Sequence, residues 1–365
     1  MPIALYTLTS PLHSEAIRPA CEEAFIQDIE RAMGEKFAFR ADDFSDYGTF
    51  ENSLIYIRTG GTEGLFKELN LQGEIRLLAS GSSNSLAAAM EILSYLRSRG
   101  QKGEILHGSP SGISGRMTNT AFIRKLPDID LGGIRLGVIG KPSDWLISSD
   151  VDYAKAKSRL NVELIDIPMQ ELVDKAKTCT CEGSEAIYEA LREIIAEYNL
   201  GGLTIRCFDL LDTLHNTGCL ALARLNSEGI PAACEGDIPA LLSMAYLQKT
   251  KGCPGFQCNL SRIDGDELLF AHCTVPLSMT TSYKYMTHFE SGIGTAIKGE
   301  MPLCEVEIFK ISPDLEHFVS IPGRIIRNSS EKNLCRTQIV VKAPGAADYF
   351  LRTPLANHHI VSYLP

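Results

Sequence analysis

Short apolar runs recur along much of the chain, and each is followed by small or polar residues and then by a helical pattern. The run 54–57 ends in Arg-Thr-Gly-Gly-Thr-Glu, and the run 75–79 ends in Ser-Gly-Ser-Ser-Asn-Ser. After the second run, 86–99 carries a helical pattern that Gly100 ends. Strand, loop and helix in this order form the unit of a parallel sheet. We expect the loops at the strand carboxyl ends to bind ligands, as they do in open α/β sheets.

A second set of such units begins near Gly132. The predicted strands are 134–140, 162–167, 203–208 and 230–234. The predicted helices are about 169–177, 184–198, 218–226 and 238–248. This alternation predicts a second Rossmann-like parallel α/β domain.

From about Gly252 the helical periodicity fades. Runs rich in β-formers, separated by turn residues, occur at 268–272, 283–289, 305–311, 324–326 and 338–341. Such a series predicts a mostly antiparallel β-domain, either a sandwich or a barrel. Loop-like stretches near 127–133 and 249–256 are the best boundaries. The predicted domains are therefore 1–131 (α/β), 132–252 (α/β) and 253–365 (β).

Composition limits the partners. The 365 residues carry a formal net charge of −10, so nucleic acid and anionic membranes are poor partners. No apolar segment approaches the roughly 20 residues of a membrane helix, and the first residues do not resemble a signal peptide. The 11 cysteines are dispersed and odd in number, which favours reduced, buried thiols. We therefore expect a cytoplasmic protein.

The segment Cys-Glu-Gly-Asp at 234–237 contains the first candidate for chemistry. Glu235 follows an apolar run, where a buried parallel strand should end. A carboxylate at that place either binds a ligand or metal or caps the next helix. Asp237 is the more natural N-cap for the helix that follows, because an Asp side chain accepts hydrogen bonds from the first turn. That division leaves Glu235 free for chemistry.

Histidines far along the chain are the second group of candidates. His272 lies in an apolar strand, so it is either a ligand at the site or an ordinary histidine of the hydrophobic core. His358 and His359 are adjacent, so at most one should face a given site, and a frayed tail is the alternative for both. His288 and Glu290 are two apart on a predicted strand and should share a face, as a site pair or as a surface ion pair.

Together, Glu235, a C-terminal histidine and His272 would offer oxygen and imidazole ligands. That mixture of ligands is typical of Mn²⁺, Mg²⁺, Co²⁺ or Fe²⁺ sites rather than of a thiolate zinc site. No competing nucleotide or nucleophile motif is present, since the chain lacks a Gly-x-Gly-x-x-Gly helix start, a P-loop and a Gly-x-Ser-x-Gly elbow.

Motifs along most of the chain resemble the L-fucose/L-arabinose isomerase superfamily, in particular its fucose isomerase-like branch. The matching segments are 85–92, 140–147, 206–208, 217–222, 234–237, 271–276, 288–292, 335–338 and 357–359. The resemblance implies two α/β domains followed by a β-domain, and assembly as a homo-oligomer, a trimer or hexamer.

The resemblance also implies a reaction, aldose–ketose isomerisation of a small open-chain sugar or sugar acid through an enediol, with Mn²⁺ as the expected metal. Glu235 would be ligand and base, and His358 or His359 a ligand. The position of a second carboxylate in the family falls at Asn259, whose amide oxygen can bind a metal but cannot act as a base. Glu290 would then supply the acid/base group.

This departure leaves other reactions open on the same fold. They are a metal-dependent lyase, epimerase or decarboxylase, or a catalytically silent sugar-binding protein. For the substrate itself, the resemblance suggests that Trp145 stacks on a sugar face and that His288 contacts it. Arg206 and Arg336 would hold a carboxylate or phosphate as bidentate forks. Trp145, the one tryptophan, is equally suited to anchor the core.

Overall fold

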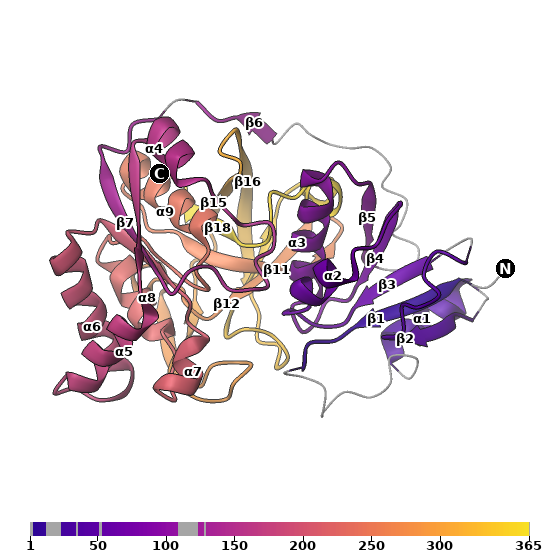
Figure 1. The fold of residues 1–365 in the computed structure, drawn as a ribbon, viewed down its shortest axis with the longest axis horizontal. Helices are drawn as coiled ribbons and strands as arrows, with labels where there is room; N and C mark the ends of the chain where they lie inside the picture. Colours follow the sequence, from indigo (N-terminus) through magenta and orange to yellow (C-terminus); the bar gives the residue numbers. More distant parts are fainter. Residues whose placement is uncertain are drawn as a thin grey trace.

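The computed structural model describes residues 3–11, 23–33, 36–50, 53–108, 123–127 and 129–364. Its first part is a parallel sheet in the order β2-β1-β3-β4-β5, at the right of Figure 1. The strands are β1 (Ala4–Leu8), β2 (Ala38–Ala41), β3 (Ser53–Ile57), β4 (Ile75–Ala79) and β5 (Gly103–Leu106). The helices are α1 (Ala24–Met33), α2 (Glu63–Leu69) and α3 (Ser85–Ser98). The strand–loop–helix units predicted around 54–99 are confirmed.

A second parallel sheet has the order β10-β9-β7-β8. Its strands are β7 (Ile134–Ile139), β8 (Val162–Ile167), β9 (Gly202–Ile205) and β10 (Ala232–Ala233). Its helices are α4 (Tyr153–Leu160), α5 (Met169–Thr178), α6 (Gly183–Tyr198), α7 (Asp209–Thr213), α8 (Cys219–Ser227) and α9 (Ile238–Lys251). The strand predicted over 230–234 is shorter than expected. Pro231 has no amide hydrogen to pair, and the amide of Cys234 donates instead to the side chain of Gln257.

The third part is a closed antiparallel barrel of six strands, which settles the choice between sandwich and barrel. The strand order is β15-β18-β11-β12-β17-β16, and pairing of β15 with β16 closes the ring, so none of these strands has a free edge. The strands are β11 (Phe256–Asp264), β12 (Glu267–His272), β15 (Glu305–Ile311), β16 (His317–Asn328), β17 (Thr337–Lys342) and β18 (His359–Tyr363). A short strand from an earlier part of the chain, β6 (Ile123–Lys125), pairs with β16.

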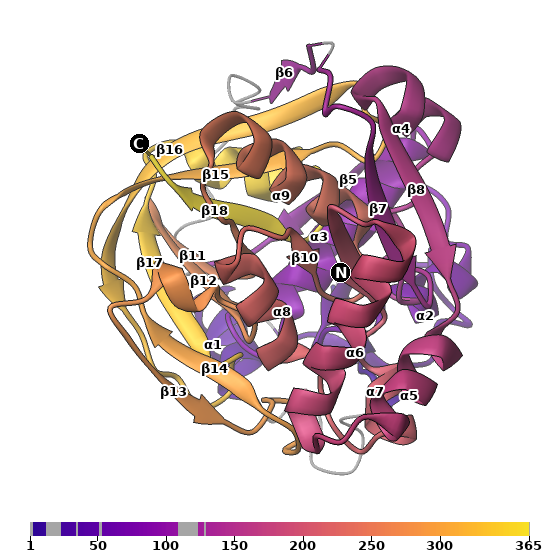
Figure 2. The same ribbon diagram turned by 90° about the vertical axis from the view of Figure 1, so that its left-hand side faces the viewer.

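A hairpin of β13 (Ser282–Met286) and β14 (Ala296–Glu300) lies beside the barrel (Figure 2). A short 3₁₀ turn (Leu277–Met279) precedes it, and helix α10 (Ala346–Arg352) precedes β18. The prediction of one strand over 283–289 is wrong in its second half, because the chain turns after Met286. The amide of Gly292 donates to the carbonyl of His288, and Gly292 has a positive φ of 69° that favours glycine. His288 and Glu290 therefore do not share a strand face.

Helix α3 lies between the first sheet and the barrel and is buried along most of its length (Figure 1). Glu91 of α3 is fully buried and links three parts of the chain. Its Oε1 accepts a 2.6 Å hydrogen bond from the amide of Ser148, and its Oε2 accepts a 3.0 Å bond from the amide of Asn357. This carboxylate ties α3 to the loop after β7 and to the segment that enters β18.

Replacing Glu91 with Ala should therefore lower the free energy of unfolding by about 2 to 4 kcal/mol, since two buried amides lose their acceptor. Urea denaturation measures the change. A matched control is Glu68→Ala on α2, where the side chain is exposed and the expected change is within about 0.5 kcal/mol. Equal unfolding midpoints for the two variants would contradict the role assigned to Glu91.

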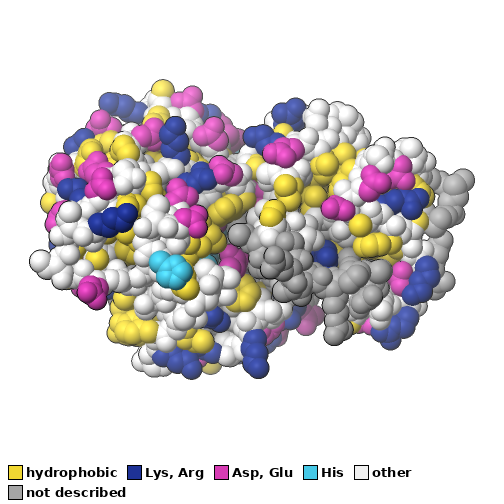
Figure 3. Space-filling model, turned by 60° about the horizontal axis from the view of Figure 1, so that its bottom comes forward, with side chains coloured by type: hydrophobic (Ala, Val, Ile, Leu, Met, Phe, Trp, Pro, Cys, Tyr) yellow, Lys and Arg dark blue, Asp and Glu magenta, His cyan; other side chains and the backbone are white. Residues whose placement is uncertain are grey.

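Two further observations concern the surface and the cysteines. Positively and negatively charged side chains are interspersed on the face that Figure 3 shows. No helix within the described ranges is long and apolar enough to cross a membrane. The ten described cysteines form no disulfide with one another, and six of them are buried, whereas Cys179, Cys181, Cys253 and Cys304 are partly exposed. Cys21 lies outside the described residues.

Candidate functional site

A cavity of about 340 Å³ lies where the two sheets and the barrel meet. Glu63, the first residue of α2, and Asn84, in the loop after β4, contribute to its wall. The segment after β10 contributes Glu235, and β12 contributes His272. The parallel strands reach this cavity with their carboxyl ends, which is where such sheets bind ligands.

The backbone at 235–237 places Glu235 in the cavity. Glu235 and Gly236 both have left-handed conformations, with φ of 65° and 70°. A Cβ on Gly236 would lie 2.3 Å from the carbonyl oxygen of Lys141, so only glycine fits there. Asp237 then caps α9, with its Oδ1 accepting a 2.7 Å bond from the amide of Ala240, which confirms the predicted N-cap.

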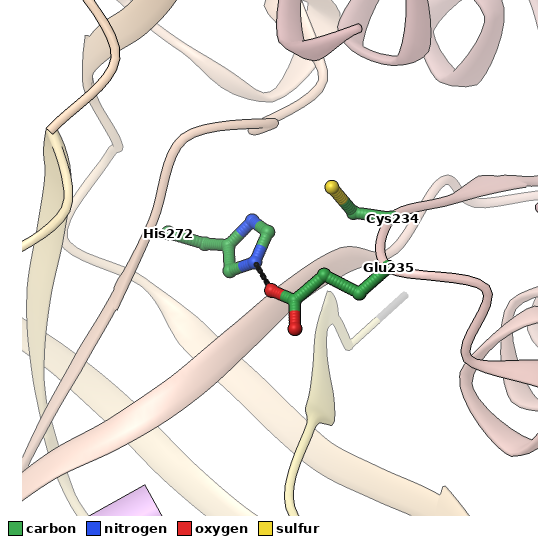
Figure 4. Close-up of side chains that lie close together, drawn as sticks. All are labelled: Cys234, Glu235 and His272. Carbon is green, nitrogen blue, oxygen red and sulfur yellow. Dashed lines mark ion pairs between the residues drawn. The ribbon is translucent and has the colours of Figure 1, made fainter. Parts of the chain in front are cut away.

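Three donors surround the carboxylate of Glu235. Trp145 Nε1 donates to Oε2 at 2.6 Å, while the Nε2 atoms of His358 and His272 lie 3.4 and 3.5 Å from Oε1. Figure 4 shows Glu235 and His272 pointing toward one another. Burial alone would raise the pKa of Glu235, but His358 and His272 hold it well below its ordinary value. Glu235 is therefore an ionised acceptor, and a weak base.

His358 is fixed by a buried chain of charges behind it. Its Nδ1 donates to Asp237 Oδ2 at 2.9 Å, and Lys310 Nζ lies 3.5 Å from the same oxygen. All three side chains are fully buried. Burial lowers the pKa of His358, but Glu235 and Asp237 raise it to about 10. Its Nε2 lies 3.4 Å from Glu235 Oε1 and makes no hydrogen bond of ordinary geometry among the described residues.

The structure does not bring His359 to the cavity. Its Nε2 bonds to the hydroxyl of Tyr349 at 2.7 Å, and its Nδ1 bonds to the carbonyl of Asn357 at 2.8 Å. Burial lowers its pKa to about 3. It points to the opposite face of the chain from His358, as adjacent strand residues do. The alternative of a frayed tail is wrong, because His359 begins β18, a strand of the closed barrel.

Oxygen and imidazole donors converge at Glu235, and they suit a divalent cation. The converging atoms are Glu235 Oε1 and the Nε2 atoms of His272 and His358. Asn259 lines the same cavity, and its Oδ1 is buried without a hydrogen-bond partner in the described chain. The Asp237 carboxylate behind His358 matches the outer partner that metal-binding histidines usually have.

Cys234 also lies close enough to be considered as a ligand. Ligand atoms of Cys234, Glu235 and His272 lie within 4.8 Å of one another (Figure 4). However, the sulfur of Cys234 lies 3.0 Å from that of Cys207. The hydrogen bond with Cys207 and burial raise the pKa of the Cys234 thiol well above its ordinary value. Because the thiolate is the ligand form, Cys234 fits a metal less well than His358 and Asn259 do.

A second carboxyl group, Glu290, lines the same cavity from the turn after β13. Burial and the charge of Glu235 raise its pKa to about 7, and Asn84 Nδ2 donates to its Oε1 at 3.2 Å. A carboxyl group with this pKa exchanges protons readily near neutral pH. His288 also reaches the cavity, although the strand on which it was predicted ends earlier.

Aromatic side chains form another part of the wall. Trp145 and Phe208 meet edge to face, with ring centroids 4.8 Å apart, and Phe208 meets His288 in the same way at 5.6 Å. All three line the cavity. Trp145 thus contacts both Glu235 and the cavity space, where a sugar face could stack on it.

The two predicted arginine forks are used within the protein. Arg206 binds Asp144 through Nη1 and Nη2, at 3.0 and 2.6 Å, and also binds Asp209. Arg336 donates from Nε to the carbonyl of Thr287 at 2.7 Å. Neither arginine is among the described residues that line the cavity.

Glu63 was missed by the sequence reasoning. It is 2% exposed, its Oε2 has no hydrogen-bond partner within the described chain, and it lines the cavity. The one signal in the sequence is its place, in a glycine-rich loop directly after a predicted strand. The sequence predicts that loops of this kind bind ligands, but the local pattern around Glu63 indicates only a turn.

No protein-family model matches the sequence. Over 280 residues, the chain is 22% identical to a sulfoquinovose isomerase of Alkalicoccus urumqiensis, a match that covers 69% of this chain and 62% of that protein. The chain is similar to sugar isomerases. A sulfoquinovose isomerase of Clostridium sp. (strain MSTE9) is 28% identical over 172 residues, which cover 44% of this chain and 38% of that protein. This chain thus matches less than two thirds of the length of either relative.

Proposed function

We propose that this protein is a metal-dependent isomerase that interconverts the aldose and ketose forms of a small open-chain sugar. The observation that carries the proposal is the convergence of two imidazoles on Glu235 Oε1 in a cavity that also holds Glu290. The similarity to sulfoquinovose isomerases supports the same reaction class.

The residues that would hold the metal are Glu235, His272, His358 and Asn259. A divalent cation bound there would polarise the carbonyl and the neighbouring hydroxyl of the sugar. Asp237 keeps a proton on His358 Nδ1, so a cation would bind Nε2 and displace the second proton of the imidazolium from that atom. Trp145 holds Glu235 Oε2, which leaves Oε1 as the ligand atom.

Glu290 would move the proton. Its carboxylate would take the proton from C2 of the open-chain aldose and, as the carboxylic acid, return it to C1 of the enediol, while the proton of the C2 hydroxyl passes to the oxygen on C1. Its pKa of about 7 leaves comparable amounts of both forms near neutral pH, as this shuttle requires. Glu235 is assigned to metal binding alone, because its lowered pKa makes it a weak base.

Isotope exchange tests this function. The purified protein with Mn²⁺ would be incubated in D₂O with a panel of aldoses and ketoses that includes sulfoquinovose. An isomerase of this kind is expected to form ketose from aldose with all carbons retained and with deuterium at C1. Deuterium at C2 without a ketose would mean epimerisation, loss of carbon would mean a lyase or decarboxylase, and either result would overturn the proposal. So would the absence of any product from the whole panel.

A further inference from the structure

The first sheet supplies two polar side chains to the cavity that the proposed proton transfer does not use. Glu63 follows the loop after β3, and Asn84 follows β4. Glu63 is 2% exposed, and its Oε2 has no hydrogen-bond partner among the described residues. The Oδ1 atom of Asn84 is likewise buried and unpartnered within those residues, while its Nδ2 donates to Glu290.

Unpartnered buried oxygens are uncommon, because each costs free energy that a hydrogen bond would recover. Here both oxygens belong to residues that line the same cavity as Glu235 and His272. A bound molecule can therefore supply the missing partners. The backbone favours the same arrangement, since Ser83 and Asn84 both have positive φ, 52° and 55°, in the loop that aims Asn84.

The chemistry of the two groups is complementary. Burial and the nearby charges of Glu91, Glu235 and Glu290 raise the pKa of Glu63 well above its ordinary value. A raised pKa favours the protonated form of Glu63, whose O–H can donate, while Asn84 Oδ1 accepts. A hydroxyl group can do both, because it has one hydrogen to donate and lone pairs that accept.

We propose that Glu63 and Asn84 form a subsite that binds hydroxyl groups of an uncharged sugar. This inference rests on the proposed function, and it narrows the substrate class. The cavity wall contains the carboxyl groups of Glu63, Glu235 and Glu290, and its described lining residues include no lysine or arginine. Arg206, whose chain segment borders the cavity at Phe208, is held by Asp144 and Asp209. A sulfonate or phosphate would lie near the ionised Glu235 and would find no lysine or arginine among the described lining residues to balance its charge.

Binding of alditols tests the subsite without requiring turnover, because an alditol has no carbonyl group to isomerise. The 365-residue chain with Mn²⁺ would be titrated calorimetrically with xylitol, ribitol, arabinitol and fucitol, and separately with sulfoquinovose, whose sulfonate is charged. The variants are Glu63→Leu, Glu63→Gln and Asn84→Ala, with Glu68→Gln on the exposed face of α2 as the control.

We expect wild-type protein to bind its best alditol at least about tenfold more tightly than sulfoquinovose. Glu63→Leu and Asn84→Ala should each lower the affinity for that alditol by about 10- to 100-fold. Glu63→Gln keeps an uncharged donor and should lose less than about fivefold, and Glu68→Gln should bind as wild type. Thermal denaturation of each variant confirms that it is folded, and Asn84→Ala tests the subsite if Glu63→Leu does not fold.

The subsite would be overturned if sulfoquinovose bound more tightly than every alditol, or if wild type bound no alditol. It would also be overturned if folded Glu63→Leu bound alditols as wild type does, or if Glu63→Gln and Glu63→Leu lost the same amount of alditol affinity. Failure of the isomerase proposal gives a different pattern. Alditol binding that depends on Glu63, together with no turnover of any sugar in the panel, would support the subsite and reject the reaction.

Discussion

Replacing Glu290 with Gln is expected to lower kcat by about 100- to 10,000-fold, the range that general acid–base catalysis contributes. The amide keeps the size of the side chain and an acceptor for Asn84 Nδ2, but it cannot take a proton from C2. Alditol affinity should change little. Steady-state kinetics on the sugar that turns over fastest, combined with the calorimetric titration, separates the two effects.

The pH profile gives the same test a second readout. Glu290 must be ionised to act as the base in the aldose-to-ketose direction. We therefore expect kcat/KM to rise with pH up to about 7 and to stay constant at higher pH. That rise should be absent in Glu290→Gln. The matched control is Glu300→Gln, at the end of β14, which should keep the wild-type rate and profile. A Glu290→Gln variant with the wild-type kcat would remove Glu290 from the proposed mechanism.

Loss of Glu235 is expected to have the other large effect. Glu235→Ala should lose tightly bound metal and lower kcat/KM by at least about 1,000-fold, because it removes the carboxylate on which both imidazoles converge. Elemental analysis after gel filtration, and titration with Mn²⁺, measure the metal directly. Equal metal content and turnover in wild type and Glu235→Ala would place the metal, if one is bound, elsewhere in the protein.

Asp237→Asn provides a graded comparison with Glu235→Ala. Asparagine can still cap α9 through its side-chain oxygen, but it no longer offers His358 a charged partner. Changes to such outer partners typically weaken metal affinity by about 10- to 100-fold. The expected order of Mn²⁺ affinity is therefore wild type, then Asp237→Asn, then Glu235→Ala. The reverse order for the two variants would contradict the ligand assignment.

Local sequence patterns predicted much of the fold and part of the site. The alternation of apolar runs with helical patterns predicted both parallel sheets, because each unit is specified within some thirty residues. The N-cap preference of Asp separated the role of Asp237 from that of Glu235. That separation needed only the neighbouring residues, and the cap bond from Ala240 confirms it.

The features that sequence did not predict depend on distant segments. Barrel closure depends on the pairing of β15 with β16 and of β18 with β11 and β15, which no single strand specifies. Which of two adjacent histidines faces Glu235 depends on the register of β18. Glu63 shows the same limit, because its burial against the cavity arises from contacts with chain segments far away in sequence, and its local pattern is that of an ordinary turn.

The origin of the cavity walls from three separate parts of the fold has an evolutionary consequence. The groups proposed to hold the metal and move the proton come from the second sheet, the barrel and its hairpin. The groups proposed to select the sugar come from the segments that follow β3 and β4 of the first sheet. Loops at strand ends tolerate insertions and substitutions better than barrel strands do. Related chains can therefore acquire new substrates by exchanging these loops, while inheriting the reactive centre intact.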